Sequence, residues 1–103
     1  MKFAVIAIAT VAALLSLGQA AAADDGKATY NKACAVCHAL GLLNAPKLGD
    51  KAMWEPRIKT GGADALTTSV IAGKGVMAPR AGVASLSDAD IRAAVDYMIS
   101  QVK

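Results

Sequence analysis

The sequence predicts an all-α fold of about four helices. No strand pattern longer than three residues is present anywhere in the chain. Four segments instead carry helix start and stop signals or helical apolar spacing, and glycines and prolines separate them. Neither an internal repeat nor a low-complexity linker indicates a second domain.

The first 23 residues have the pattern of a secretory signal peptide. Lys2 precedes an apolar run over 3–17, and small residues follow at 20–23. The run is shorter than the roughly 20 residues that a membrane-spanning helix needs, so we expect cleavage rather than anchoring. The expected product is one domain over 24–103, exported to the periplasm and not inserted in the membrane.

The first helix is expected from Asp24 or Asp25 to about Ala39. Acidic residues at its start favour a helix N-terminus, and helix-tolerant residues follow. Pro46 disfavours helical backbone at the residue before it. Residues 41–49 are therefore expected to form a loop.

A second helix is expected over 51–59, with Asp50 as its N-cap and Gly61-Gly62 at its end. Pro56 should limit the regularity of this helix. A third helix is expected over 63–72, where glycine at 73 provides a stop. One face of the third helix holds Leu66, Val70 and Ile71.

The last helix is expected from Ser87 to about Gln101, after a loop over 76–85. Ser87 and Asp90 have the spacing of a capping box. The apolar positions of this helix recur at i, i+4, i+7 and i+11, which indicates a buried face. They are Ile91, Val95, Met98 and Val102.

Residues 34–38 read Cys-Ala-Val-Cys-His, and Cys34 and Cys37 are the only cysteines in the chain. C-x-x-C-H is typical of covalent c-type haem attachment. On a helix this spacing places both sulfurs on one face, as two thioether bonds to haem require. His38, the only histidine, lies on the same face and is the expected first axial ligand of the iron.

Three alternative roles for the motif are weaker. A disulfide between Cys34 and Cys37 would close a very short loop and leave His38 unexplained. A thioredoxin-like redox pair needs a β-α-β frame, which the alanine-rich flanking residues do not indicate. A structural zinc site normally has four Cys or His ligands, and this chain has only these three residues.

The size of the domain also indicates a bound cofactor. A domain of about 80 residues rarely builds a sufficient core from side chains alone, and bound haem would supply the missing apolar surface. We therefore expect the chain without haem to be largely unfolded.

The charge of the chain gives no support to nucleic-acid binding. The formal charge of +3, from 11 basic and 8 acidic residues, falls to +2 when Lys2 is removed. The basic residues are scattered, so no basic patch supports nucleic-acid binding.

The second axial ligand decides between electron transfer and chemistry at an open iron. Met98 lies in the apolar stripe of the last helix, where a core role is favoured, and Met53 is a weaker candidate inside a short helix. Met77 lies in Gly-Lys-Gly-Val-Met-Ala-Pro-Arg, a loop whose glycines permit close backbone approach and whose proline stiffens it. We therefore expect the sulfur of Met77 to be the second ligand.

The C-x-x-C-H motif, the loop N-A-P-K-L-G-D-K, the segment M-W-E-P-R-I and the run G-K-G-V-M-A-P-R together resemble bacterial class I cytochromes c of the cytochrome c5 type. The resemblance covers nearly all of 24–103. It implies a small class I cytochrome c fold, with helices wrapped around one covalently bound haem and with Met77 as sixth ligand.

The same resemblance implies a haem environment. The Pro46 carbonyl is expected to accept a hydrogen bond from the ring N–H of His38, and Trp54 and Arg57 to lie near the haem propionates as donors. The chain departs from the family in having Ala78 where many members have a second proline, and in lacking the additional cysteine pair of some members.

The expected function is that of a periplasmic monohaem carrier that transfers one electron by an outer-sphere step and is not an enzyme. Its partners would be donor and acceptor proteins that bind transiently to a monomer, at an interface rimmed by Lys47, Lys74 or Arg80. One alternative is a five-coordinate haem protein that binds small ligands or reduces peroxide. Another is a haem subunit of a membrane redox enzyme.

Overall fold

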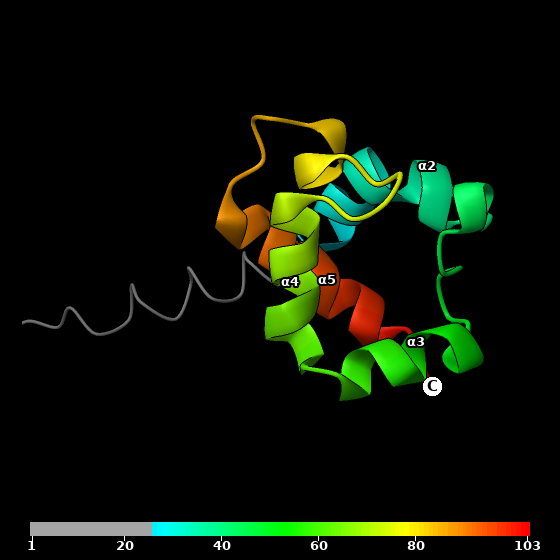
Figure 1. The fold of residues 1–103 in the computed structure, drawn as a ribbon. Coiled ribbons are helices and arrows are strands. Elements are labelled where there is room, and N and C mark those ends of the chain that lie inside the picture. Colours follow the sequence, from blue (N-terminus) through cyan, green and yellow to red (C-terminus); the bar gives the residue numbers. More distant parts are fainter. Residues whose placement is uncertain (1–25) are drawn as a thin grey trace, which may run out of the picture.

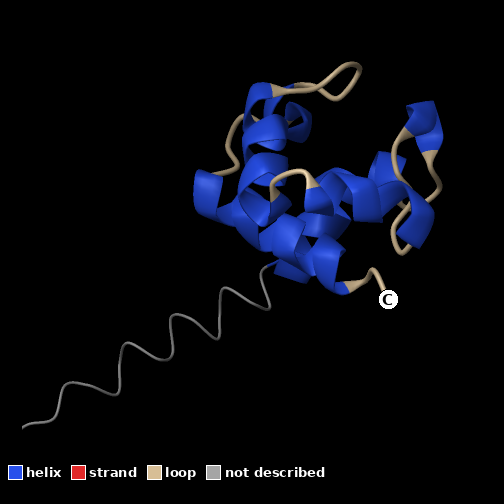
Figure 2. Cartoon of the chain, turned by 60° about the horizontal axis from the view of Figure 1, so that its bottom comes forward, coloured by secondary structure: helices blue, strands red, loops and turns tan. Residues whose placement is uncertain are grey.

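The computed structural model describes residues 26–103 (Figure 1). The expected signal peptide at 1–23 and the expected start of the first helix at 24–25 lie outside this range. Helices dominate 26–103, and the only β pairing within these residues is an isolated bridge (Figure 2). The all-α prediction is confirmed. In this part of the chain no helix has the length and apolar character needed to cross a membrane.

The N-terminal helical run covers 26–38 and contains the C-x-x-C-H motif. It is α-helical at 26–29, passes through the π-helical turn η1 at Tyr30–Cys34, and continues as α2 at Ala35–His38. The expected first helix is thus confirmed over the described residues. The π turn, in which the N–H of Ala35 bonds to the carbonyl of Tyr30, was not predicted. Such turns often occur at functional sites, and this one ends at the first cysteine of the motif.

The expected loop after α2 is tightly turned. Its short 3-10 helix η2, at Leu42–Asn44, follows Gly41, which has a left-handed φ of 75°. Leu43 and Asn44 also have positive φ, 54° and 65°. Leucine adopts this backbone only when the surrounding contacts hold it there. The chain then runs from the end of η2 to α3 (Figure 1).

Helices α3, at Lys51–Lys59, and α4, at Gly62–Ala72, correspond to the expected second and third helices. Asp50 caps α3, because its Oδ1 accepts a hydrogen bond of 3.3 Å from the N–H of Met53. Pro56 lies inside α3 without ending it, since its missing N–H removes only one hydrogen bond. Gly62, expected at the end of α3, is instead the first residue of α4.

Helix α5, at Asp88–Ser100, has the capping box that the sequence predicted. The N–H of Asp90 donates to Ser87 Oγ at 3.0 Å, and the N–H of Ser87 donates to Asp90 Oδ2 at 3.1 Å. Three of the four stripe positions are buried, and the fourth, Val102, lies beyond the helix end and is half-buried. The buried positions are Ile91, Val95 and Met98.

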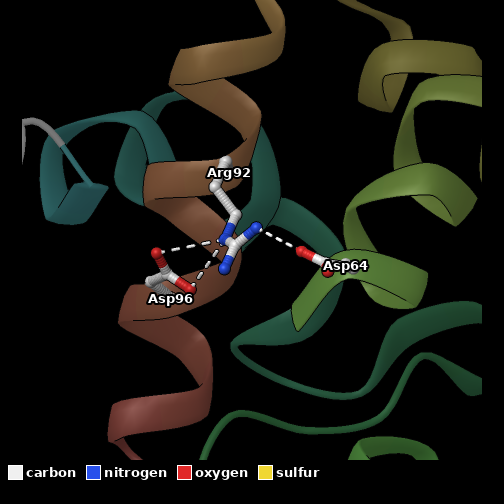
Figure 3. A network of polar contacts seen from close by, with 3 residues as sticks. All are labelled: Asp64, Arg92 and Asp96. Atoms are coloured by element: carbon white, nitrogen blue, oxygen red, sulfur yellow. Dashed lines mark hydrogen bonds and ion pairs between the residues drawn. The ribbon is translucent and has the colours of Figure 1, made fainter. Parts of the chain in front are cut away.

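Helix α5 packs against both α4 and the N-terminal run. Gly26 faces the backbone of Ala93 so closely that a Cβ at this position would overlap the Ala93 carbonyl. On the α4 side, Arg92 of α5 donates to Asp64 of α4 at 2.6 Å and to Asp96 of its own helix at 3.1 Å (Figure 3). A close backbone contact and a surface ion-pair network therefore fix α5 on its two sides.

The buried core of the described residues is small and falls into two clusters. The first joins the N-terminal run to α5 and the preceding loop, and it consists of Ala33, Leu86, Ile91 and Val95. The second joins the N-terminal run, α3 and α5, and it consists of Tyr30, Trp54 and Met98. Both clusters supply side chains to the wall of a single cavity.

Candidate haem site

One cavity of about 440 Å³ brings together most of the expected site residues. The C-x-x-C-H motif opens onto it through Cys34, Cys37 and His38, all half-buried. Pro46, Trp54, Arg57 and Met77 also line it. The rest of the wall is largely apolar and comes from every part of the fold, including Ala33, Leu66, Val70, Leu86, Ile91, Val95 and Met98.

The residues present suit a covalently bound haem. The volume lies in the range of about 300–1,000 Å³ that is usual for cofactor pockets, and an apolar wall matches an apolar macrocycle. The wall also holds two thiols, one imidazole and the thioethers of Met77 and Met98, and these are the kinds of group that thioether attachment and axial ligation of haem require. No set of three or more His, Cys, Asp or Glu side chains suited to a metal ion occurs among 26–103.

His38 is oriented by the loop that follows it. Its Nδ1 lies 2.8 Å from the carbonyl oxygen of Pro46, the hydrogen bond that the family resemblance implied. Because a carbonyl oxygen only accepts, Nδ1 carries the proton and the lone pair of the neutral ring is on Nε2. A backbone hydrogen bond joins the same two segments, because the N–H of Leu48 donates to the His38 carbonyl at 2.7 Å.

Trp54 supports the same loop rather than offering a donor to the cavity. Its indole N–H, the donor that the resemblance assigned to a haem propionate, donates in this structure to the Lys47 carbonyl at 2.9 Å. The ring packs against His38, with ring centroids 5.8 Å apart. Three consecutive residues, Pro46, Lys47 and Leu48, are therefore each held by a hydrogen bond to His38 or Trp54.

Arg57 lines the cavity and uses part of its guanidinium within α3. Its Nη1 donates to the Met53 carbonyl at 2.6 Å. This accounts for one of five N–H groups, and the others remain suited to a carboxylate such as a propionate.

No disulfide joins Cys34 and Cys37, and burial raises the pKa of the Cys34 thiol above its ordinary value. Helical spacing is kept from Cys34 to His38, because the π turn ends where the motif begins. The two sulfurs and the imidazole therefore approach the cavity from one side of the N-terminal run.

The structure separates the three candidate methionines. Met77 lines the cavity from the loop after α4, whereas Met53 is not part of the cavity wall. Met98 also lines the cavity, but its side chain is only 5% exposed and packs in the core cluster with Tyr30 and Trp54. Met98 thus has the core role that its position in the apolar stripe indicated.

The backbone of the Met77 loop is folded back onto the end of α4. Lys74 and Met77 exchange two backbone hydrogen bonds of 2.9 Å, which close a tight turn around Gly75. A Cβ at Gly73 would lie 2.9 Å from the nitrogen of Pro79, so only glycine allows the loop to pass this close. Of the glycines that the sequence singled out here, Gly73 is thus required by the close passage of the loop. The 3-10 helix η3, at Pro79–Gly82, follows inside the expected loop and was not predicted.

Exposed apolar side chains surround the mouth of the cavity, which the sequence reasoning did not single out. Val36 is 73% exposed, Leu43 is 67% exposed and Val76 is 74% exposed, and all three also line the cavity. Leu42, 48% exposed, lines the cavity as well, and Leu40, 73% exposed, lies two residues after the C-x-x-C-H motif. For the four residues over 36–43, the signal available in the sequence was the run of apolar residues around and after the C-x-x-C-H motif, whereas Val76 lies beside Met77. We call these five residues the apolar rim.

The charges near the rim are positive. The segments 26–49 and 65–87, which supply all five rim residues, contain no Asp or Glu. Their exposed cations include Lys47 and Lys74, as expected for the interface. Arg80, also expected there, is half-buried and bonds to the Leu86 carbonyl and to Asp88.

Comparison with known proteins relates the chain to cytochromes. Residues 21–98 match the family described as cytochrome c oxidase, cbb3-type, subunit III. The chain is 48% identical over 98 residues to cytochrome c-555 of Chlorobaculum tepidum, covering 89% of this chain and 90% of that protein. It is 42% identical over 82 residues to cytochrome c5 of Azotobacter vinelandii, covering 79% of this chain and 95% of that protein.

A solved structure shares the fold. A chain from the crystal structure of the electron transfer complex of nitrite reductase with cytochrome c is 49% identical in sequence and superposes with a TM-score of 0.72. The match covers 77% of this chain and 95% of that chain.

Proposed function

The chain belongs to the class I c-type cytochromes, which carry covalently attached haem c, and on this basis we propose that it is a periplasmic one-electron carrier. Its relatives are monohaem electron-transfer proteins. The cofactor expected from the sequence, haem c, is therefore the one that the family carries. Bound haem c supplies an iron that cycles between the ferric and ferrous states.

The residues have separate roles in this proposal. Cys34 and Cys37 form the two thioether bonds, His38 presents Nε2 to one face of the iron, and Met77 presents its sulfur to the other. The hydrogen bond from His38 Nδ1 to Pro46 supports this assignment, because it fixes the ring orientation and increases the basicity of Nε2.

The observation that carries the proposal is that one cavity receives both thiols, the imidazole and the Met77 thioether, which come from segments far apart in the chain. With a protein ligand on each face, no position is left for a substrate, so the protein carries electrons without making or breaking substrate bonds. Two fixed ligands also keep the geometry similar in both oxidation states, which favours outer-sphere transfer.

We propose that redox partners bind transiently at the apolar rim, with Lys47 and Lys74 at its border. The exposure of Val36, Leu43 and Val76 beside the cavity supports this location. An electron transfer complex is known for the similar chain that occurs with nitrite reductase. The signal-peptide pattern at 1–23 supports a periplasmic location, and we propose that the exported protein is a monomer.

The test is the optical spectrum of the oxidised holoprotein and of Met77→Ala. We expect the wild type to show a sulfur-to-iron charge-transfer band and Met77→Ala to lose it. Met53→Ala is the matched control, because Met53 lies outside the cavity wall, and it should keep the band. A band that persists in Met77→Ala would contradict the assignment and direct attention to Met98.

Carbon monoxide separates the carrier from the five-coordinate alternative. We expect the reduced wild type to bind carbon monoxide slowly and weakly at neutral pH, and Met77→Ala to bind it rapidly. Rapid binding by the wild type would falsify the carrier proposal. Purification tests the other alternative, since a fixed subunit would be isolated with larger membrane proteins.

A further inference from the structure

The Met77 loop ends in a strained turn. Arg80 and Ala81 each have a φ of 55°, and Gly82 has a φ of 81°. Three consecutive residues are thus left-handed, and two of them carry a Cβ, for which this backbone is unfavourable. Such a turn persists only where neighbouring contacts hold it.

Arg80 makes contacts that hold the turn. Its Nη1 donates to the Leu86 carbonyl at 2.9 Å, and its Nη2 lies 2.7 Å from Asp88 Oδ1. Leu86 is buried in the first core cluster, and Asp88 is the first residue of α5. The guanidinium therefore fastens the end of the Met77 loop to both the core and the last helix.

No other side chain performs this task in the loop. Across 73–86, all of which the structure describes, Arg80 provides the only side-chain hydrogen bond. The upstream end is closed by backbone alone, through the pair between Lys74 and Met77. Met77 thus lies between a backbone turn on one side and the Arg80 contacts on the other.

We propose that Arg80 is a positioning residue that keeps Met77 in place as the axial ligand. This inference rests on the proposed ligation by Met77. Arg80 acts through the loop and does not itself ligate the iron, and it stabilises the closed arrangement of the loop over the open one. Removing its contacts raises the fraction of molecules in which the sulfur has left its position.

The experiment is cyanide binding to the oxidised holoprotein, because an external ligand competes with Met77 for one coordination position. Apparent affinity rises in proportion to the open fraction. We expect Arg80→Ala to bind cyanide about tenfold more tightly than the wild type, as the loss of a charge-assisted contact implies. Arg80→Lys, which keeps one donor but not the fork, should fall between them.

The chain offers a matched control in Arg92. It also joins two segments through short contacts to carboxylates, since it connects α5 to Asp64 of α4 (Figure 3). None of its contacts involves the Met77 loop. Arg92→Ala should therefore leave cyanide affinity unchanged even where it lowers thermal stability. Asp88→Asn, which weakens only the ion pair, is the second variant to use where Arg80→Ala does not fold, and it should raise cyanide affinity by a smaller factor.

The outcomes distinguish a failure of the proposed ligation by Met77 from a failure of the positioning role of Arg80. When the wild type binds cyanide as tightly as Met77→Ala, the ligation by Met77 is wrong. When these two differ but the Arg80 and Asp88 variants match the wild type, only the positioning role fails. Equal increases for Arg80→Ala and Arg92→Ala would likewise refute it, because the effect would then report general stability.

Discussion

His38 and Met77 line the same cavity, but different kinds of contact fix the segments that carry them. The His38 side is held by side chains and nearby backbone: Pro46, Lys47 and Leu48 each bond to His38 or Trp54. The Met77 side is held by a glycine turn and, at its end, by Arg80. The two cysteines are also on the His38 side, so attachment of the cofactor strengthens the side that is already better held.

This difference assigns the two sides different tasks. A rigid His38 side keeps haem in one orientation. The Met77 side depends on few contacts, so the bond between Met77 and the iron is expected to break before the bond to His38. Local opening in proteins starts where few buried contacts hold a segment. Removal of the cofactor that joins the two sides, and substitutions on each side, test this asymmetry.

The largest effect is expected from leaving out haem. The cavity lies between the two core clusters, so the haem-free chain over 24–103 should lose most of its helical signal and unfold without a cooperative transition. Far-UV circular dichroism during heating measures this. A sharp thermal transition in the haem-free chain would show that the two sides come together without the cofactor.

The next largest effect is expected from Gly73→Ala, which targets the Met77 side. A Cβ here meets Pro79 at 2.9 Å in a residue with a φ of 88°, so steric overlap adds to backbone strain. We expect a loss of about 2 kcal/mol in unfolding free energy, together with a weaker sulfur-to-iron band. Denaturant titration and the optical spectrum measure the two effects.

Gly75→Ala is the control for that substitution. Gly75 has a φ of 60° but nothing within 4 Å of an added Cβ, so only the backbone penalty of about 1 kcal/mol applies. Equal losses of unfolding free energy in Gly73→Ala and Gly75→Ala would mean that the close passage of the loop over α4 does not contribute to stability.

Trp54→Phe tests the opposite side and should have a smaller effect. It removes the hydrogen bond to the Lys47 carbonyl while keeping an aromatic ring beside His38. We expect a loss of about 1 kcal/mol in unfolding free energy with the sulfur-to-iron band intact. Disappearance of the band in this variant would contradict the independence of the two sides.

The sequence predicted contacts between residues that are close in the chain, and it did not predict contacts that depend on how the loops fold. The caps at Asp50 and Ser87 depend on residues three positions away, and both are confirmed. The C-x-x-C-H motif is equally local, and its family resemblance also implied the hydrogen bond from His38 to Pro46, which is present. Such features are readable because the partners are close in the chain.

The contacts that depend on the packed loops were not predicted. Trp54 was expected to donate to haem, but the folded loop brings the Lys47 carbonyl to its N–H first. The contacts of the Arg80 guanidinium with the Leu86 carbonyl and Asp88 were not predicted either. The acceptors that Trp54 and Arg80 use cannot be chosen before the path of each loop is known. The π turn at Tyr30–Cys34 was also missed, because it has no sequence signal of its own.

The smallest effect concerns acid pH and the end of the Met77 side. The N–H of Ser87 donates to the Asp90 carboxylate, and the Ser87 side chain adds to this, so the pKa of Asp90 lies below its ordinary value. A carboxyl whose pKa is lowered by folding stabilises the protein above its ordinary pKa, and this contribution is lost as pH falls through the lowered value. Because the capping box directly follows Leu86, which anchors Arg80, its loss should slightly favour opening of the Met77 loop. Thermal midpoints of the holoprotein should therefore fall less steeply with acidification in Asp90→Ala than in the wild type, and parallel curves would exclude this contribution.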